Sequence, residues 1–489
     1  MARVRLTRRQ MLAGLAATTA SMAEAGAPAR SLRPAPRGEG TVRVAPAPAD
    51  ALIRRSGLNG DVAYVVLNAE TGETLEEYNP ALPLPPASTA KALTSLYAMD
   101  ALGLEYRFET KLLATGEIRD GRIEGDLILA GGGDPVLDTD GLMEMASALK
   151  AAGIREVGGY LRVWTDALPN LYQIDDKQPA YVGYNPAICG LNLNFNRVRF
   201  GWERQGTDYL VNMDARSGRY QPGVEMARME IVDRSTPVYT YDGVAGIDAW
   251  TVARRALGTS GARWLPVRRP GLYAGEVFQV LARSQGIVCN GPVKTADTLD
   301  GKVLHTRQSE SLAPILKDML KYSNNMTAEV VGLSASQKVG EPVASLPESA
   351  SRMNDWLARE MSLTGIALED HSGLGDDSRV TAMGMARAMQ ASGLDGPLRP
   401  LLKDFRLEET TFGVVAKTGT LNFVSALTGF VTGPKGTPLA FAILCADLPR
   451  RDSLTVAERE KPEGGSRWNG AAKWLQRALI DRWGKSHLL

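Results

Sequence analysis

Three short polar motifs stand far apart in this chain of 489 residues, and their order and spacing limit its fold more than any other feature. Ser88–Lys91 has the pattern S-x-x-K, Ser323–Asn325 the pattern S-x-N, and Lys417–Gly419 the pattern K-T-G. Each motif alone arises often by chance, but the three in this order form a specific signature. A fold that brings them together must join segments from both ends of the chain.

The first motif combines a nucleophile with a base. A serine hydroxyl is a weak nucleophile unless a base stands beside it. A helix pattern begins at about Ser88, and residues three apart on a helix share a face, so Lys91 lies one turn from Ser88. A lysine is a base only when burial or another cation lowers its pKa, and Lys417 is a candidate for that cation. The spacing therefore predicts Ser88 as the nucleophile and Lys91 as its base.

The other two motifs complete a site for a substrate with a free carboxylate. The stretch Val414–Leu421 predicts a strand, and Gly419 lacks a Cβ that would obstruct a substrate against its edge. Lys417 and Thr418 can then bind a carboxylate, while Ser323 relays a proton to the leaving amine. Taken singly, each motif has an ordinary explanation, such as a helix cap or an edge-strand lysine. The conjunction favours catalysis.

With these motifs the chain resembles the class C low-molecular-mass penicillin-binding proteins, the D-alanyl-D-alanine carboxypeptidase/endopeptidase family. The similarity runs from about residue 50 to the C-terminus, and Gly125–Leu127, Gly132–Pro135 and Asp370–Leu374 also carry it. The resemblance implies hydrolysis of peptidoglycan stem peptides and cross-links through an acyl-enzyme, and acylation by β-lactam antibiotics. It implies no cofactor.

The resemblance also assigns roles to individual residues. Asn325 contacts a substrate amide, and the backbone N–H groups of Ser88 and Thr420 form the oxyanion hole. Asp376 stands where family members that prefer diaminopimelate have an arginine near that side chain. The sequence therefore leaves the third residue of the stem peptide open.

The fold class expected is α/β and multidomain. A β-lactamase/transpeptidase-like domain, an antiparallel sheet covered by helices, carries a large insert of two smaller domains, because 235 residues (323 − 88) separate the first two motifs. A C-terminal helix with Trp474, Leu475, Leu479 and Trp483 is expected on the sheet, and strict alternation over Leu191–Phe200 predicts a strand. The predicted boundaries are 1–27 for an export signal, 28–49 for a disordered lead-in, 50–105 with 303–489 for the catalytic domain, 106–183 for an inserted α/β subdomain and 184–302 for an inserted β-rich subdomain.

The N-terminus has the features of a removable export signal. Arg8 and Arg9 precede a short apolar run, and Ala25–Ala27 forms an A-x-A cleavage site. The paired arginines favour the twin-arginine route, with the general secretory route as the alternative. The run is too short to span a bilayer, and no later stretch of 18 apolar residues occurs. We therefore expect a periplasmic mature protein without a transmembrane anchor.

Composition excludes other classes. Lys and Arg total 56 against 55 Asp and Glu, so no basic excess points to nucleic acid. Three Cys and three His match no metal motif. The sequence leaves open whether Cys189, Cys289 and Cys445 include a disulfide pair or are three buried thiols.

Two rival functions use the same cleft. A β-lactamase shares acylation but needs an activated water for rapid deacylation, and no residue is identified for that task. A non-catalytic cell-wall-binding protein has no need of Ser88, Lys91, Ser323 and Lys417 together.

Overall fold

The computed structural model describes residues 47–243, 246–407, 410 and 412–488. The predicted export signal lies outside these residues, as does all but the end of the predicted lead-in. Among the described residues, no helix is both long and apolar enough to cross a membrane. The three cysteines are separate buried thiols.

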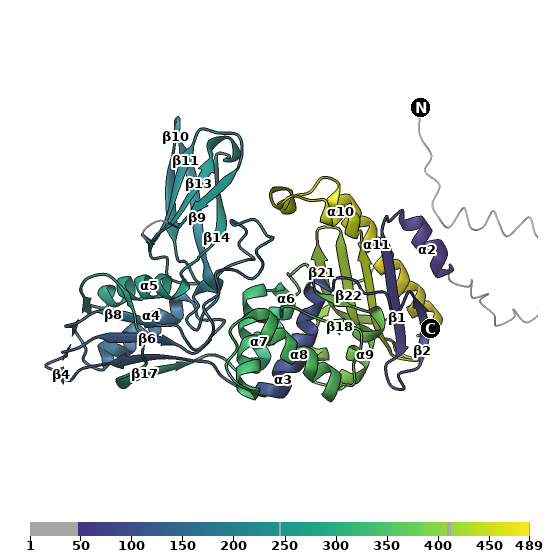
Figure 1. Cartoon of the computed structure of the whole chain (residues 1–489), viewed down its shortest axis with the longest axis horizontal. Coiled ribbons are helices and arrows are strands. Elements are labelled where there is room, and N and C mark those ends of the chain that lie inside the picture. Colours follow the sequence, from purple (N-terminus) through teal and green to yellow (C-terminus); the bar gives the residue numbers. More distant parts are fainter. Residues whose placement is uncertain (1–46, 244–245, 408–409, 411, 489) are drawn as a thin grey trace, which may run out of the picture. The chain divides into compact units, whose positions relative to one another are not determined.

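A six-stranded antiparallel sheet lies at the centre of the catalytic part and is drawn from both ends of the chain (Figure 1). Its strand order is β2-β1-β23-β22-β21-β20. The strands are β1 (Asp61–Asn68), β2 (Thr74–Tyr78), β20 (Lys403–Asp404), β21 (Gly413–Leu421), β22 (Val424–Thr432) and β23 (Leu439–Ala446). The side chains of β1 alternate between the two faces of the sheet. Successive residues of β1 therefore pack into two different hydrophobic cores, one on each face.

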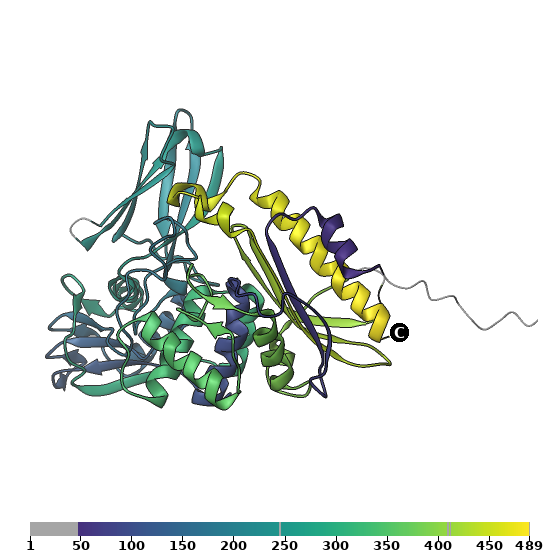
Figure 2. The ribbon, with the colours of Figure 1, turned by 45° about the vertical axis from the view of Figure 1, so that its right-hand side comes forward.

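Helices cover both faces of this sheet. On one face, α11 (Gly465–His487) packs on β22 and on α2 (Ala49–Ser56), as two views show (Figures 1 and 2). Leu475, Leu479 and Trp483 are buried there as predicted. Trp474 is not: it is 37% exposed and lies against the guanidinium of Arg55. The four residues do not share one face of the helix, since Trp474 precedes Leu475 by one position.

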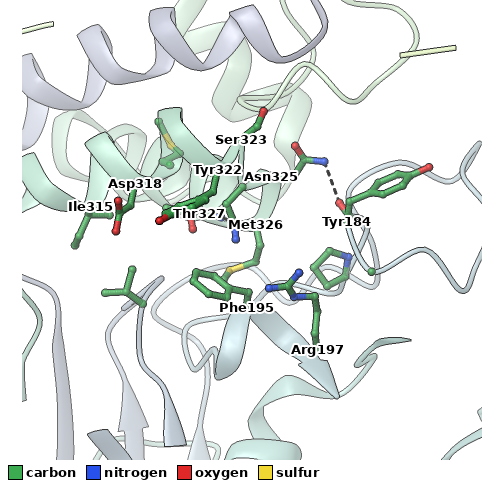
Figure 3. Close-up of a pocket in the computed structure, with 15 residues that line it drawn as sticks. Tyr184, Phe195, Arg197, Ile315, Asp318, Tyr322, Ser323, Asn325, Met326 and Thr327 are labelled. Atoms are coloured by element: carbon green, nitrogen blue, oxygen red, sulfur yellow. Dashed lines mark hydrogen bonds between the residues drawn. The ribbon is translucent and has the colours of Figure 1, made fainter. Parts of the chain in front are cut away.

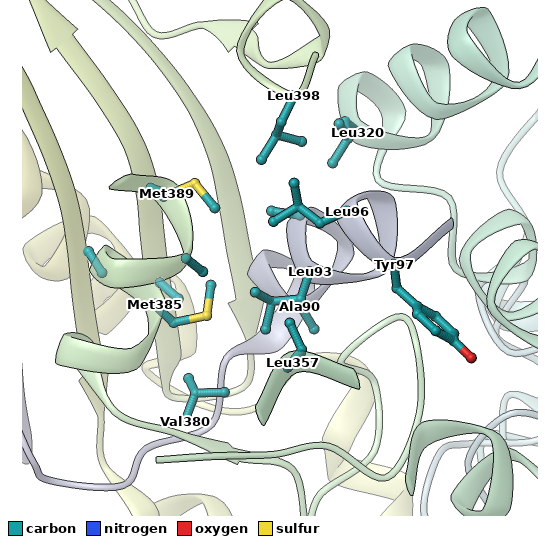
Figure 4. Packing of buried hydrophobic residues seen from close by; sticks show 14 of the residues in the cluster. Ala90, Leu93, Leu96, Tyr97, Leu320, Leu357, Val380, Met385, Met389 and Leu398 are labelled. Carbon is teal, nitrogen blue, oxygen red and sulfur yellow. The ribbon is translucent and has the colours of Figure 1, made fainter. Parts of the chain in front are cut away.

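The other face is covered by five helices, three of which carry or flank the first two motifs. They are α3 (Ala90–Leu102), α6 (Leu312–Tyr322), α7 (Asn325–Val339), α8 (Leu346–Glu360) and α9 (Ala382–Ser392). Residues Ala90–Ala98 of α3 are buried without interruption, so α3 is a core helix enclosed by the others. Figure 4 shows Leu93 and Leu96 of α3 among Met385, Met389 and Leu398.

The insert contains several smaller sheets. The largest has the order β16-β8-β6-β3-β17 and is covered by α4 (Thr139–Ala151) and α5 (Pro270–Ser284). Its strands are β3 (Glu109–Ala114), β6 (Leu127–Gly131), β8 (Leu161–Trp164), β16 (Lys294–Thr295) and β17 (Lys302–Gln308). A boundary between two inserted subdomains was predicted at residue 183. This sheet and its two helices contain segments from both sides of that boundary.

Further strands form three small sheets. Their orders are β10-β9-β14, β11-β13-β12 and β15-β7-β5-β4. The strands are β4 (Ile118–Arg119), β5 (Arg122–Ile123), β7 (Glu156–Val157), β9 (Arg197–Gln205), β10 (Asp208–Asp214), β11 (Ala227–Val232), β12 (Tyr239–Asp242), β13 (Asp248–Ala253), β14 (Ser260–Pro266) and β15 (Val288–Cys289). The predicted fold class, an antiparallel sheet covered by helices with a large inserted region, is confirmed.

The strand predicted over Leu191–Phe200 is wrong in its first half. Asn194, Phe195 and Asn196 have φ values of 52°, 57° and 51°, and β9 begins only at Arg197. The buried Asn196 amide donates to the carbonyl of Ala187 at 2.8 Å. Asparagine tolerates the left-handed region because its side chain can hydrogen-bond locally, so these bonds replace a strand ladder.

Candidate active site

The first motif lies on a tight turn that leads into α3. Ala87–Thr89 forms a 3-10 turn, and the α-helix begins at Ala90, two residues after the predicted start. Ala87 has a φ of 45°, and the Thr89 hydroxyl donates to the carbonyl of Pro86 at 2.7 Å. The turn is therefore held by its own contacts and leaves Ser88 only half-buried.

Lys91 is fully buried beneath this turn and has three polar neighbours. Its Nζ lies 3.0 Å from the Ser88 hydroxyl, as the helical spacing predicts. It also donates to Asn325 Oδ1 at 2.7 Å and to the carbonyl of Ser372 at 2.8 Å. The second and third neighbours are reached only through the fold, since they are far from Lys91 in the chain.

Burial lowers the pKa of Lys91 to about 8, while the buried carboxylates of Glu329 and Asp370 act in the opposite direction. The largest cause is desolvation, which the sequence did not reveal. The repulsion between the two lysines is seen in the pKa of Lys417. Burial, followed by the charges of Lys91 and Lys403, holds the pKa of Lys417 well below its ordinary value.

A loop that follows α8 brings the Ser372 carbonyl to Lys91. Asp370 accepts hydrogen bonds from the backbone N–H groups of Gly373 and Gly375, both at 2.7 Å. Glu329, on α7, accepts from the N–H groups of His371 and Ser372 at 2.9 and 2.8 Å. Both acids are fully buried, and burial raises the pKa of each. They fix the backbone that orients Lys91.

The second motif lies at the junction of α6 and α7. Ser323 ends α6 in the left-handed conformation, with φ 58°. The Asn324 side chain accepts from the N–H of Thr327 at 3.0 Å and caps α7, which is a usual role for asparagine. Asn325 is then the first residue of α7, and its Nδ2 donates to the carbonyl of Tyr184 in the insert at 3.0 Å.

The third motif lies on β21, beside the Ala87–Thr89 turn that carries Ser88, which we call the nucleophile turn. The Nζ of the buried Lys417 donates to the Ser323 hydroxyl at 2.9 Å and to the Thr418 carbonyl at 2.7 Å. Thr418 and Thr420 are exposed, whereas Gly419 is buried. A Cβ on Gly419 would lie 2.7 Å from the Pro86 carbonyl oxygen. The close approach of the Ala87–Thr89 turn is thus one reason for a glycine at this position, and the sequence did not reveal it.

A cleft of about 310 Å³ opens over these groups. Its lining includes Ser88, Ser323, Asn325 and Thr420. The structure therefore brings these four predicted site residues to one cleft. Lys91 lies beneath Ser88, and Lys417 reaches Ser323 from β21.

One wall of this cleft carries a group of charges that the sequence did not reveal. Asp376 is bound by Arg451, and also by Arg459 at 2.5 Å. Both arginines line the cleft. Two guanidinium groups from the region before α11 therefore lie next to Asp376, at the position where the resemblance implied an arginine.

Other residues of the site were missed for a simple reason. Glu329 follows six residues after Ser323, and a single acid inside the apolar run Met326–Leu333 was the available signal. Tyr184, Arg451 and Arg459 have no local pattern at all. Among the described residues, no group of three or more His, Cys, Asp or Glu side chains could hold a metal ion.

Comparison with known proteins agrees with this geometry. The model of the D-Ala-D-Ala carboxypeptidase 3 (S13) family matches residues 47–461, and the chain belongs to this family. It is a serine-type carboxypeptidase of the class C penicillin-binding protein group that acts on peptidoglycan, so the resemblance found in the motifs is confirmed.

Individual relatives cover most of the chain. The D-alanyl-D-alanine carboxypeptidase of Actinomadura sp. is 29% identical over 86% of both proteins. The D-alanyl-D-alanine carboxypeptidase DacB of Haemophilus influenzae is 24% identical over 78% of this chain and 84% of its own length. The crystal structure of penicillin binding protein 4 from Haemophilus influenzae matches with a TM-score of 0.71 at 21% identity, over 89% of this chain and 99% of that one. At that identity, the structural match establishes the fold.

Proposed function

We propose that Ser88 is the acylated nucleophile and that the neutral amine of Lys91 is its base. The observation that carries this proposal is the set of neighbours around Lys91 Nζ. Asn325 Oδ1 and the Ser372 carbonyl can only accept hydrogen bonds, so they take the two N–H groups of a neutral amine. The lone pair is then left for the third neighbour, Ser88, whose hydroxyl can donate.

The reaction then proceeds in two steps. Ser88 Oγ attacks the carbonyl carbon of the D-Ala-D-Ala bond while Lys91 takes the hydroxyl proton. The C–N bond breaks, the D-Ala amine leaves with a proton passed through Ser323, and water hydrolyses the resulting ester. Ser323 suits this relay because its hydroxyl lies 2.9 Å from Lys417 Nζ and borders the cleft that contains Ser88.

The remaining predicted residues bind and polarise the substrate. Thr418 and Thr420 are exposed on β21, while Lys417 brings its amine to within 2.9 Å of the Ser323 hydroxyl. We assign the terminal D-Ala carboxylate to Lys417 and Thr418, and a substrate amide to Asn325. The oxyanion is assigned to the backbone N–H groups of Ser88 and Thr420. Preorganised hydrogen-bond donors of this kind stabilise a developing negative charge strongly.

We extend the proposed activity to peptide cross-links and to β-lactams. We expect the cleft of about 310 Å³ to accept the chain that continues beyond the scissile bond. A penicillin binding protein 4 structure in complex with a β-lactam matches this chain with a TM-score of 0.69. The amide carbonyl of the β-lactam ring takes the place of the D-Ala-D-Ala carbonyl that Ser88 attacks.

The decisive experiment is mass spectrometry after incubation with a β-lactam. One intact drug mass on a peptide containing Ser88, absent in Ser88→Ala, is the expected result. Label on another serine contradicts the assignment. Rapid turnover of benzylpenicillin, instead of a lasting adduct, would make the protein a β-lactamase.

We also propose export to the periplasm through the twin-arginine route. The support is the order of Arg8 and Arg9, the apolar run and Ala25–Ala27. Replacing both arginines by lysine is expected to leave precursor in the cytoplasm. Unchanged processing points to the general secretory route.

A further inference from the structure

A second hollow, of about 410 Å³, lies next to the catalytic cleft and has no role in the reaction described above (Figure 3). Tyr184, Ser323 and Asn325 line both hollows. The hydrogen bond from Asn325 Nδ2 to the Tyr184 carbonyl joins the insert to α7 between them. A ligand in the second hollow is therefore a direct neighbour of a substrate on Ser88.

The wall provided by the insert contains an arginine without a counter-ion. Arg197 lies between two aromatic rings, 5.3 Å from the ring centre of Phe195 and 5.5 Å from that of Trp264. Its guanidinium makes no hydrogen bond or ion pair with the residues that the structure describes, and its Nε is buried. A partly desolvated, unpaired guanidinium attracts a carboxylate much more strongly than one in water.

The opposite wall contains a second polar group without a partner. Thr327, on α7, is 2% exposed, and its Oγ1 is buried without a hydrogen-bond partner among the described residues. Buried polar groups are nearly always hydrogen-bonded, so such a group indicates a missing ligand or water. The rest of the lining is mostly apolar, with Val136, Phe195, Ile315, Met319 and Met326. A mostly apolar hollow with a few convergent polar groups is typical of a ligand site.

We propose that this hollow is a subsite for the second peptide of a cross-linked substrate, with Arg197 binding a carboxylate of that peptide. This inference rests on the proposed action at cross-links. A cross-linked peptide carries a second chain with its own carboxylates, whereas a short D-Ala-D-Ala peptide ends inside the cleft. The apolar wall accommodates the aliphatic part of that chain, and Thr327 donates to it.

The lining also carries one negative charge, and replacing it tests the sign of the ligand. Asp318, on α6, is exposed and forms no ion pair with Arg197 within the described part of the chain. A cationic ligand would use Asp318 and avoid Arg197. A carboxylate ligand does the reverse, so Asp318→Asn is expected to leave its binding unchanged or to strengthen it.

The test compares kcat/KM for a cross-linked peptide dimer and for a short N-acetylated D-Ala-D-Ala peptide. Arg197→Leu is expected to lower kcat/KM on the dimer at least about tenfold, mainly through KM, because a charge-assisted hydrogen bond is lost. The short peptide is expected to be cleaved as by the unmodified enzyme. Arg197→Lys, which keeps the charge, is expected to retain most of the preference.

Matched controls separate this subsite from a structural role. Arg199 lies on the same strand and pairs with Asp214 at 3.4 Å, and Arg199→Leu is expected to leave both substrates unaffected. Thr327→Val keeps the shape of the side chain and is expected to weaken dimer cleavage about fivefold; it also serves if Arg197→Leu does not fold.

Equal losses on both substrates, or no loss on the dimer for Arg197→Leu and Thr327→Val, overturn the subsite. Failure of the unmodified enzyme to cleave either substrate instead overturns the proposed function.

Discussion

The protonation of Lys91 is expected to control the rate of acylation. Burial lowers the pKa of this amine to about 8 from an ordinary value of 10.5. Only the neutral form accepts the Ser88 proton, so the reactive fraction falls as the pH drops below this pKa. The rate constant is therefore expected to rise about tenfold per pH unit up to pH 7 and to level off above pH 8.

The measurement is stopped-flow acylation by a chromogenic β-lactam between pH 5.5 and 10, at constant ionic strength. Lys91→Gln is expected to lose about 10²–10⁴-fold in rate, the usual contribution of a general base. Lys403→Gln, which replaces an exposed lysine on β20, is the control and is expected to keep the midpoint. A midpoint near 10.5, or a rate independent of pH, would show that Lys91 is not the neutral base, and the hydrogen-bond argument around its Nζ would fail.

Three further changes test the remaining site and its support. Lys417→Ala is expected to lower kcat/KM at least about tenfold on a peptide with a free D-Ala terminus but less on the same peptide amidated; equal losses would contradict the carboxylate assignment. Gly419→Ala places a Cβ 2.7 Å from the Pro86 carbonyl oxygen, whereas the nearest atom to a Cβ in Gly413→Ala, on the same strand, is 3.8 Å away. Only the first is expected to slow acylation by a β-lactam, at least about tenfold, because the nucleophile turn must move. Burial lowers the pKa of His371 to about 3 from 6.5, so the folded state disfavours the protonated ring. The free energy of unfolding is therefore expected to fall as the pH drops from 6.5 toward 3, by up to about 1.4 kcal/mol per pH unit. Urea titrations should show a shallower fall in His371→Gln, and an equal slope would indicate that other groups dominate.

Much of the catalytic chemistry could be predicted from the sequence because it depends on short spacings. The distance from Ser88 to Lys91 is one helical turn, and the observed 3.0 Å contact follows from it even though the helix begins two residues later than predicted. The strand Val414–Leu421 was also predictable from the sequence. Its β-branched residues are typical of a strand. It is observed as Gly413–Leu421.

Predictions from periodicity failed where side chains competed with the backbone. Alternation over Leu191–Phe200 predicts a continuous strand, but buried asparagine amides bind backbone carbonyls there and turn the chain into the left-handed region. In α11, Trp474 was assigned to the buried face on hydrophobicity alone and is partly exposed. Neither outcome can be read from residue type without the neighbours that the fold supplies.

By itself, the sequence determined which groups we propose as reactive, through the order of the three motifs and the one-turn spacing of Ser88 and Lys91. It also determined that a large insert separates the first two motifs. Only the tertiary structure decided the state of those groups. The pKa of Lys91 follows from burial under residues far away in the chain, and two hydrogen bonds of its Nζ are set by Asn325 Oδ1 and the Ser372 carbonyl. The physical reason is that helical spacing is a local property of the chain, whereas desolvation and hydrogen-bond direction depend on every segment packed around the atom.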